Sequence, residues 1–223
     1  MEKDLDSIQL PVYVINLKER VERYEHIKEQ FLDKNEFIVE IIQSEKNVKG
    51  NIGLWENIVN IVKMAQRKEE EVIIICEDDH VFTENYNKIN LIQSILKSYE
   101  QNVEVLSGGI SGGFSFVVPI DKDRYWVNHF WGLQFTAIFS SLFNDILNYD
   151  FLPNDTADDV ISALAVNKII IYPFISVQKD FGYSDVTLKN DLYKDWVSIL
   201  FHKSQETFEI YKKISDEFIW KNY

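Results

Sequence analysis

Short apolar runs alternate with amphipathic runs along the first third of the chain. Residues 12–16 are β-branched and aromatic and predict a buried strand. In residues 17–31, apolar side chains recur three or four positions apart, which predicts a helix with one apolar face. Residues 36–43 predict a second strand, and Gly50 and Gly53 mark the start of a second helix. This order predicts a sheet packed against helices.

The clearest strand signal is the run Val-Ile-Ile-Ile-Cys at residues 72–76. Consecutive apolar residues of this kind indicate burial on both faces, as in a parallel sheet that helices cover. Three carboxylates, Glu77, Asp78 and Asp79, follow at once and form what we call the acidic triplet. Ligands of such sheets bind beyond the carboxyl ends of the strands. The triplet and Asn16 are therefore expected at the functional edge.

The rest of the chain continues this alternation. Strands are predicted at 103–106, 114–118, 133–138 and 168–172, and helices near 89–99, 143–147, 158–166 and 195–220. The pattern predicts an α/β fold whose central sheet is mostly parallel and flanked by helices. Because no repeat or linker divides the chain, we predict a single domain over residues 1–223, with a core at about 11–187 and a helical tail at about 188–223.

Charge and composition exclude several classes of protein. The chain has 223 residues, of which 46% are hydrophobic, so it suits a folded domain and not a disordered one. Lys and Arg number 23 against 36 Asp and Glu, which gives a net charge of −13. So acidic a chain is a poor general binder of nucleic acid, but it suits an anionic ligand that arrives with a divalent cation. The single cysteine, Cys76, favours a reducing compartment.

The sequence indicates neither export nor membrane insertion. Its first residues are acidic and lack an apolar core, so no signal peptide is recognisable. Residues 125–144 come nearest to a membrane span, but their polar side chains predict buried strand and helix instead. We expect a cytoplasmic protein. The neutral, aromatic-rich tail leaves peripheral contact with the inner face of the cell membrane open, and the oligomeric state is not determined.

The acidic triplet is the strongest chemical signal. Carboxylates at the end of an apolar strand repel one another unless a cation or hydrogen-bond donors offset their charge. Hard oxygen ligands suit Mg²⁺ or Mn²⁺, which would also hold substrate phosphates. The alternative is a solvated acidic turn that caps the next helix. We expect a Mn²⁺ or Mg²⁺ site at this position.

Two further clusters are candidates for the site. Arg20 and Arg23 share a helix face just after the first strand, where they could hold a base or a diphosphate or simply pair with neighbouring glutamates. Asp155, Asp158 and Asp159 surround the start of a helix and could supply a carboxylate base. A threonine three residues before Asp159 is also typical of a capping box.

Other polar and aromatic residues give weaker signals. The glycine-rich segment 107–113 is a loop, but no Gly-Lys-Ser/Thr follows it, so it is not a P-loop. The four histidines lack metal-ligand spacing, although His80 and His202 could approach a metal. No Gly-x-Ser-x-Gly elbow indicates acyl chemistry. One or two rings of a dense aromatic group could stack on a sugar: Trp126, Phe130, Trp131 and Phe135.

In their order along the chain, these motifs resemble glycosyltransferase family 25, the lipopolysaccharide-type sugar transferases with a GT-A fold. The matching segments are Tyr13-Val-Ile-Asn-Leu-x-x-Arg20-x-x-Arg23, Gly50-x-Ile-Gly53, Val72-Ile-Ile-Ile-Cys-Glu-Asp-Asp79, residues 153–159, Ile171-Tyr-Pro173 with Gln178, and Ser184-Asp185-Val186. They span most of residues 11–187. The resemblance implies one GT-A-like, Rossmann-like domain.

The resemblance also implies an activity. A sugar would pass from a nucleotide diphosphate donor to a glycan or glycolipid acceptor, with inversion at the anomeric carbon. Galactose from a uridine diphosphate hexose is the family-level expectation, in the synthesis of surface polysaccharide or lipooligosaccharide. Mn²⁺ or Mg²⁺ would bind the strand-end acidic motif and offset the charge of the leaving diphosphate.

In this scheme, the residues of the sheet edge bind the metal and the donor. Asp79 would bind the metal directly, with Glu77 as a second ligand. Glu77 or Asp78 would otherwise contact the ribose or a metal-bound water. The remaining donor-binding residues come from the first strand and the helix after it: Asn16, Leu17, Arg20 and Arg23.

The catalytic base and the activity itself have alternatives. Asp155, Asp158 and Asp159 can each align with the base implied by the resemblance, with Asp158 and Asp159 preferred. A nucleotidyltransferase on a similar sheet would need a basic, phosphate-gripping loop near the first strand, and the sequence has no glycine-rich one there. A non-catalytic glycan- or partner-binding protein is the other alternative, against which the intact acidic triplet argues.

Overall fold

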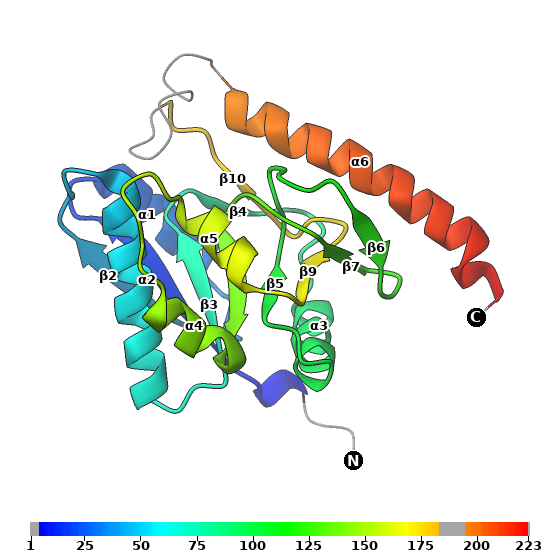
Figure 1. Ribbon diagram of the computed structural model, residues 1–223, viewed down its shortest axis with the longest axis horizontal. Coiled ribbons are helices and arrows are strands. Elements are labelled where there is room, and N and C mark those ends of the chain that lie inside the picture. Colours follow the sequence, from blue (N-terminus) through cyan, green and yellow to red (C-terminus); the bar gives the residue numbers. More distant parts are fainter. Residues whose placement is uncertain (1–4, 183–194, 223) are drawn as a thin grey trace.

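The computed structural model describes residues 5–182 and 195–222 (Figure 1). In these residues, helices surround an eight-stranded sheet with the order β2-β1-β3-β8-β5-β9-β7-β6. Its strands are β1 (Leu10–Leu17), β2 (Phe37–Ser44), β3 (Val72–Glu77), β5 (Val105–Ser107), β6 (Val117–Pro119), β7 (Arg124–Val127), β8 (Phe135–Phe139) and β9 (Lys168–Ile171). The predicted α/β fold is confirmed.

Most strands of the sheet run in one direction, as predicted. β1 pairs in parallel with β2 and β3, and β5 pairs in parallel with β9. β8 lies between β3 and β5 and is antiparallel to both, while β7 is antiparallel to β9 and to β6. The sheet is therefore mixed, with β7 and β8 reversed against a parallel majority.

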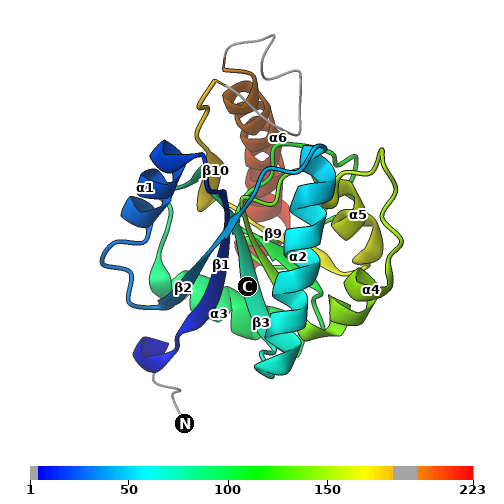
Figure 2. The same ribbon diagram turned by 90° about the vertical axis from the view of Figure 1, so that its left-hand side faces the viewer.

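Helices cover both faces of the sheet (Figure 2). On one face lie α1 (Val21–Gln30) and α3 (Lys88–Glu100), and on the other lie α2 (Gly50–Arg67), α4 (Phe143–Asn148) and α5 (Ala157–Leu164). Short 3-10 helices occur at Leu5–Ser7, Ser140–Leu142 and Trp220–Asn222. Two hydrophobic cores result, one beneath each helical layer.

The alternation of side chains along β3 explains why this strand is apolar throughout. Ile73 and Ile75 belong to one hydrophobic core, and Ile74 and Cys76 belong to the core on the opposite face. All four side chains are buried. Because a strand sends successive side chains to opposite faces, a strand covered on both sides needs an unbroken apolar run. The predicted burial on both faces is confirmed for residues 73–76, while Val72 is half-buried.

The sequence pattern does not predict a small ribbon that lies beside the sheet. It consists of β4 (His80–Phe82) and β10 (Ser176–Gln178), which pair antiparallel with Gln178 opposite His80. Strands of three residues are too short for a periodic pattern to indicate them. The strand expected at 114–118 begins later than predicted, since β6 covers Val117–Pro119. β7 has only four residues, which is also too few for a clear pattern. The ribbon brings Gln178 beside the acidic triplet.

The predicted tail helix is α6 (Trp196–Phe218), which crosses one edge of the domain near β6 and β10 (Figure 1). Its Phe208 is fully buried among aromatic rings of the domain: Phe114, Tyr125, Tyr172 and Phe174. No helix in the described part of the chain is long and apolar enough to cross a membrane. The motif Ser184-Asp185-Val186 lies outside the described residues.

Candidate active site

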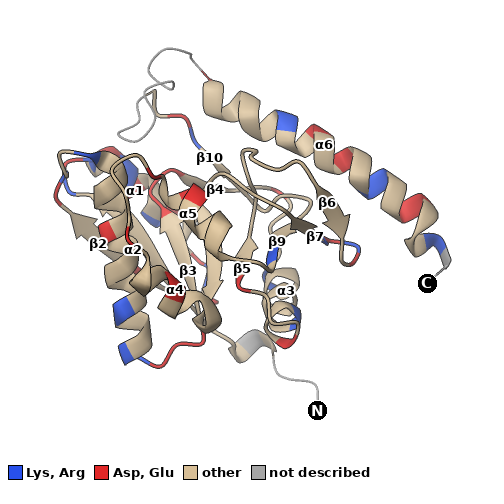
Figure 3. Ribbon diagram, viewed as in Figure 1, with Lys and Arg blue, Asp and Glu red and all other residues tan. Residues whose placement is uncertain are grey.

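A cavity of about 720 Å³ lies at the carboxyl ends of β1 and β3. Its walls come from the first turns of α1, α2, α5 and α6 and from the segments around residues 111, 131–133 and 178–181. Figure 3 shows acidic residues beside β4 and at the start of α5. This is the edge of the sheet at which the sequence places a ligand. The fold thus joins the acidic triplet and the acidic start of α5, Asp158 and Asp159, in one hollow.

Arg23 and Asn16 hold the middle member of the acidic triplet. Asp78 is 3% exposed, and its Oδ1 pairs with Arg23 Nη1 at 3.0 Å while its Oδ2 accepts a hydrogen bond from Asn16 Nδ2 at 3.0 Å. Arg20 Nη1 lies 3.6 Å from the same carboxylate, and Arg23 also pairs with Asp79 Oδ2 at 3.2 Å. Asp78 therefore anchors both arginines, at and just after the start of α1, in the cavity wall.

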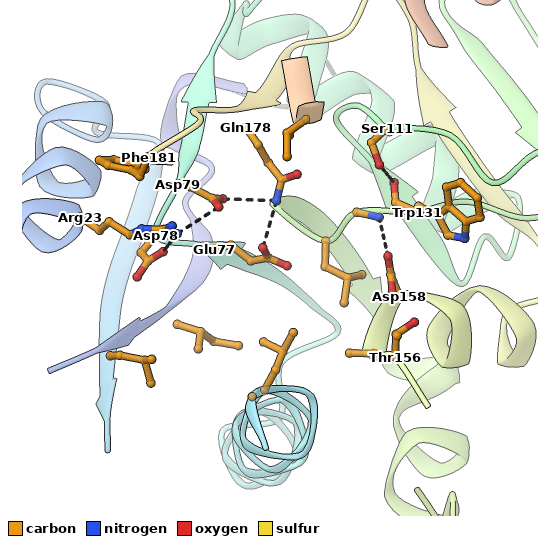
Figure 4. Close-up of a pocket in the computed structure, with 18 of the residues that line it drawn as sticks. Arg23, Glu77, Asp78, Asp79, Ser111, Trp131, Thr156, Asp158, Gln178 and Phe181 are labelled. Atoms are coloured by element: carbon orange, nitrogen blue, oxygen red, sulfur yellow. Dashed lines mark hydrogen bonds and ion pairs between the residues drawn. The ribbon is translucent and has the colours of Figure 1, made fainter. Parts of the chain in front are cut away.

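Glu77 and Asp79 converge on one amide (Figure 4). Gln178 Nε2 donates to Glu77 Oε2 at 3.2 Å and to Asp79 Oδ1 at 3.4 Å. Burial, followed by the charges of Asp79 and Asp158, raises the pKa of Glu77 well above its usual range. Burial also raises the pKa of Asp79 to about 6, against the lowering effect of Arg23. Negative charge at this wall is thus only partly offset by protein groups.

The first turn of α5 forms the opposite wall. Asp158 Oδ2 accepts a hydrogen bond from the Gly132 N–H at 3.0 Å, and its Oδ1 accepts one from the Asp159 N–H at 3.1 Å. Figure 4 shows Asp158 across the cavity from Glu77. The charge of Asp158 contributes to the raised pKa of Glu77. The two carboxylates therefore interact electrostatically across the cavity that both of them line.

Asp159 is held by three side chains. His129 Nε2 lies 2.8 Å from its Oδ1, Trp131 Nε1 donates to Oδ1 at 3.0 Å, and the Thr156 hydroxyl donates to Oδ2 at 2.8 Å. Burial acts to raise the pKa of Asp159, but these hydrogen bonds outweigh it and keep the pKa below its usual value. Thr156 is the N-cap residue of α5, yet its hydroxyl bonds this carboxylate and not the backbone expected of a capping box.

Two residues predicted for the site do not line the cavity. Asp155 Oδ2 accepts hydrogen bonds from the Leu152 N–H at 2.8 Å and from the Tyr149 hydroxyl at 3.1 Å, so this carboxylate stabilises the turn before α5. Asn16 is 1% exposed and acts through Asp78. The other candidates lie in the cavity wall: Leu17, Arg20, Arg23, Glu77, Asp78, Asp79, Asp158 and Asp159.

The histidines considered as metal ligands also lie outside the cavity wall. His80 is fully buried, its Nδ1 lies 2.8 Å from Ser176 Oγ, and its ring stacks on Phe135. The side chain of His202 is 73% exposed on α6 and pairs with Glu206 at 3.5 Å. His80 therefore belongs to the packing beneath the ribbon, and His202 lies on the exposed surface of α6.

No sequence pattern identifies two residues that contact the site, His129 and Phe181. His129 joins Asp159 to Ser162 of the same helix, since its Nδ1 lies 2.9 Å from the Ser162 hydroxyl. The Phe181 ring covers the Arg23 guanidinium, with 4.7 Å between Arg23 Cζ and the ring centre, and Phe181 also lines the cavity. Each role depends on a partner distant in sequence, so no local pattern could indicate it.

The protein supplies part of a ligand set for a divalent cation. In residues 5–182 and 195–222, no three His, Cys, Asp or Glu side chains are grouped to hold an ion by themselves. Glu77 and Asp79 nevertheless present hard oxygen atoms around a single amide, with pKa values raised by burial. Mg²⁺ commonly binds through one or two carboxylates, with phosphate and water oxygens as its other ligands. The residues present fit that arrangement.

Comparisons with known proteins establish the fold alone. No protein family model and no curated protein matches the chain. A197 from STIV is similar in structure, with a TM-score of 0.54 and 15% identity over 80% of this chain and 87% of that chain. A glycosyltransferase involved in the glycosylation of the major capsid of PBCV-1 aligns with a TM-score of 0.41 and 9% identity, over 62% of this chain and 63% of that chain. Apo-UDP-glucose pyrophosphorylase aligns with a TM-score of 0.45 and 11% identity, over 90% of this chain and 81% of that chain.

Proposed function

We propose that this protein is a metal-dependent, inverting glycosyltransferase of the GT-A type, related to family 25. It would transfer a hexose from a nucleoside diphosphate donor, with uridine diphosphate galactose as the first candidate, to a glycan or glycolipid acceptor of a cell-surface polysaccharide. The supporting observation is one cavity at the carboxyl ends of β1 and β3 that has the acidic triplet on one wall and Asp158 on the other.

The donor would bind along the wall formed by β1, β3 and α1. Arg20 lines this wall and offers a guanidinium to the diphosphate. The Arg23 side chain is 5% exposed and is engaged by two carboxylates, so its role is to position Asp78 and Asp79. Glu77 and Asp79 would hold Mn²⁺ or Mg²⁺, which supplies charge compensation for the leaving diphosphate.

Asp158 is the proposed base. The acceptor hydroxyl oxygen bonds to the anomeric carbon as the bond from that carbon to the diphosphate oxygen breaks. The hydroxyl proton passes to the Asp158 carboxylate, and the bonding electron pair leaves with the nucleoside diphosphate. Asp159 is not the proposed base, because three side chains stabilise its charged form. Asp159 instead positions Trp131 and His129.

Thermal unfolding against a panel of nucleoside diphosphates, with and without Mn²⁺, tests this proposal. A ligand that binds only the folded state stabilises it by about 2.7 kcal/mol at a concentration about one hundred times its Kd. We expect one nucleotide to raise the midpoint only with Mn²⁺, and Asp79→Asn to abolish that rise. A wild-type midpoint that no nucleotide changes would contradict the proposal and favour a binding protein.

A further inference from the structure

A second hollow adjoins the candidate active site. It has a volume of about 340 Å³, lies between the loop at residues 111–115 and α6, and shares Ser111, Trp131 and Leu200 with the main cavity. We call it the helix groove. Its remaining polar and aromatic side chains include Phe114, Ser115, Lys203, Ser204, Thr207 and Tyr211.

The helix groove differs from the main cavity in charge. No carboxylate is among the described residues that line it, and Lys203 supplies a cation. The main cavity, in contrast, contains the acidic triplet and the acidic start of α5. In a chain with a net charge of −13, a surface without carboxylates suits a neutral or anionic ligand and not a second cation.

The polar groups of the groove suit a ligand with many hydroxyls. Ser204 is 3% exposed, and its Oγ has no hydrogen-bond partner among the described residues. The Thr207 hydroxyl donates to the Lys203 carbonyl at 3.0 Å, which leaves its oxygen able to accept a hydrogen bond from a ligand. Trp131 is 43% exposed where the groove meets the cavity.

The aromatic wall of the groove is held in place before any ligand binds. Trp131 Nε1 donates to Asp159, and its backbone pairs with Gly112 in an isolated bridge. Gly113 has a φ of +90°, and a Cβ there would approach the Phe130 carbonyl carbon to 2.9 Å. A rigid indole beside hydroxyl groups is a surface on which a sugar ring can stack.

We propose that the helix groove binds the acceptor and that the acceptor is a saccharide, with one ring on Trp131 and further hydroxyls directed to Ser204 and Lys203. This inference rests on the proposed function. An acceptor in the groove reaches the main cavity at Ser111 and Trp131, beside Asp158. The tail helix α6 thereby selects the acceptor, while the sheet edge binds the donor.

Saturation-transfer NMR with lactose, cellobiose, maltose and diacetylchitobiose tests the groove. We expect at least one disaccharide to bind the wild type. Lys203→Ala should weaken that binding about tenfold through loss of a charged hydrogen-bond donor, and Thr207→Trp should abolish it by filling the groove. The matched controls on the exposed side of α6 are Lys213→Ala and Glu206→Trp, which should bind like the wild type.

Nucleotide binding separates this inference from the proposed function. Lys203→Ala should keep the nucleotide- and Mn²⁺-dependent rise in unfolding midpoint, since Lys203 does not line the main cavity. Two outcomes would overturn the groove assignment alone. In the first, both groove variants still bind the saccharide; in the second, the wild type binds nucleotide but none of the disaccharides. A wild type that binds neither nucleotide nor saccharide would overturn both.

Discussion

Among single residues, Arg23 holds two of the three carboxylates of the acidic triplet. It is 4% exposed, bridges Asp78 and Asp79, and is covered by the Phe181 ring. A buried ion pair adds little to stability relative to an apolar replacement, but removing one partner leaves an uncompensated charge. Arg23 therefore both fixes the positions of Asp78 and Asp79 and compensates their negative charge.

Replacing Arg23 with alanine should lower the free energy of unfolding by about 3 kcal/mol. The buried Asp78 would lose its nearer cation and keep only the Arg20 guanidinium, whose Nη1 lies 3.6 Å away. Urea unfolding measures the change. Lys28→Ala on the same helix, where the lysine is exposed and pairs with Glu25, should change stability by less than about 0.5 kcal/mol. Equal stabilities for the two variants would show that Arg23 does not hold the triplet.

The two aspartates of α5 should respond differently to amide substitution. Asp158→Asn removes the proposed base and should lower kcat about a hundredfold or more while KM for the donor stays within about twofold. Asp159→Asn disturbs Trp131 and should mainly raise KM for the acceptor. Steady-state kinetics of both variants make the comparison, and a larger kcat loss in Asp159→Asn would reverse the assignment.

Among the elements, the turn before β7 depends on a buried arginine. Arg124 is 2% exposed, and its guanidinium contacts Asp121 Oδ2 at 2.8 Å and the Ser98 hydroxyl of α3 at 3.2 Å. Burial acts to raise the pKa of Asp121, but hydrogen bonds from Arg124 and the Asp123 N–H outweigh it and lower the pKa below its usual value. This pair fastens the turn to α3.

The lowered pKa of Asp121 predicts how stability changes with pH. Between the folded and unfolded pKa values of Asp121, the unfolded state binds more protons, so stability rises with pH. The contribution of Asp121 is complete above its unfolded pKa and is lost as pH falls through the lower folded pKa. Acid titration of the unfolding free energy should therefore be flatter below about pH 4 in Asp121→Asn than in the wild type. Parallel titration curves would contradict this.

In the molecule as a whole, α6 completes both hollows, and Phe208 fixes it to the domain. Phe208→Ala should destabilise the protein by about 3–5 kcal/mol, as large cavities in aromatic cores do. Phe218→Ala is the matched control because Phe218 is 72% exposed on the same helix, and it should cost less than about 0.5 kcal/mol. Thermal unfolding distinguishes them, and a stable Phe208→Ala variant would mean that the helix docks by other contacts.

Local patterns along the chain are sufficient to predict the main layers of this fold. Unbroken apolar runs mark strands that helices cover on both faces, and helical spacing marks the helices, because both patterns come from local geometry and burial. The acidic triplet also follows from local order, since it ends the clearest strand. Its place at the functional edge is a consequence of parallel topology.

Which side chains meet is a property of the folded chain. Gln178 reaches Glu77 through a ribbon too short to leave a pattern, and Asp155 turns away to hold a loop while Asp158 faces the cavity. Neighbouring aspartates are equivalent in sequence, so their roles depend on the helix start that orients them. The charge balance of the site and the groove beside α6 likewise arise from contacts between distant segments, which no local pattern records.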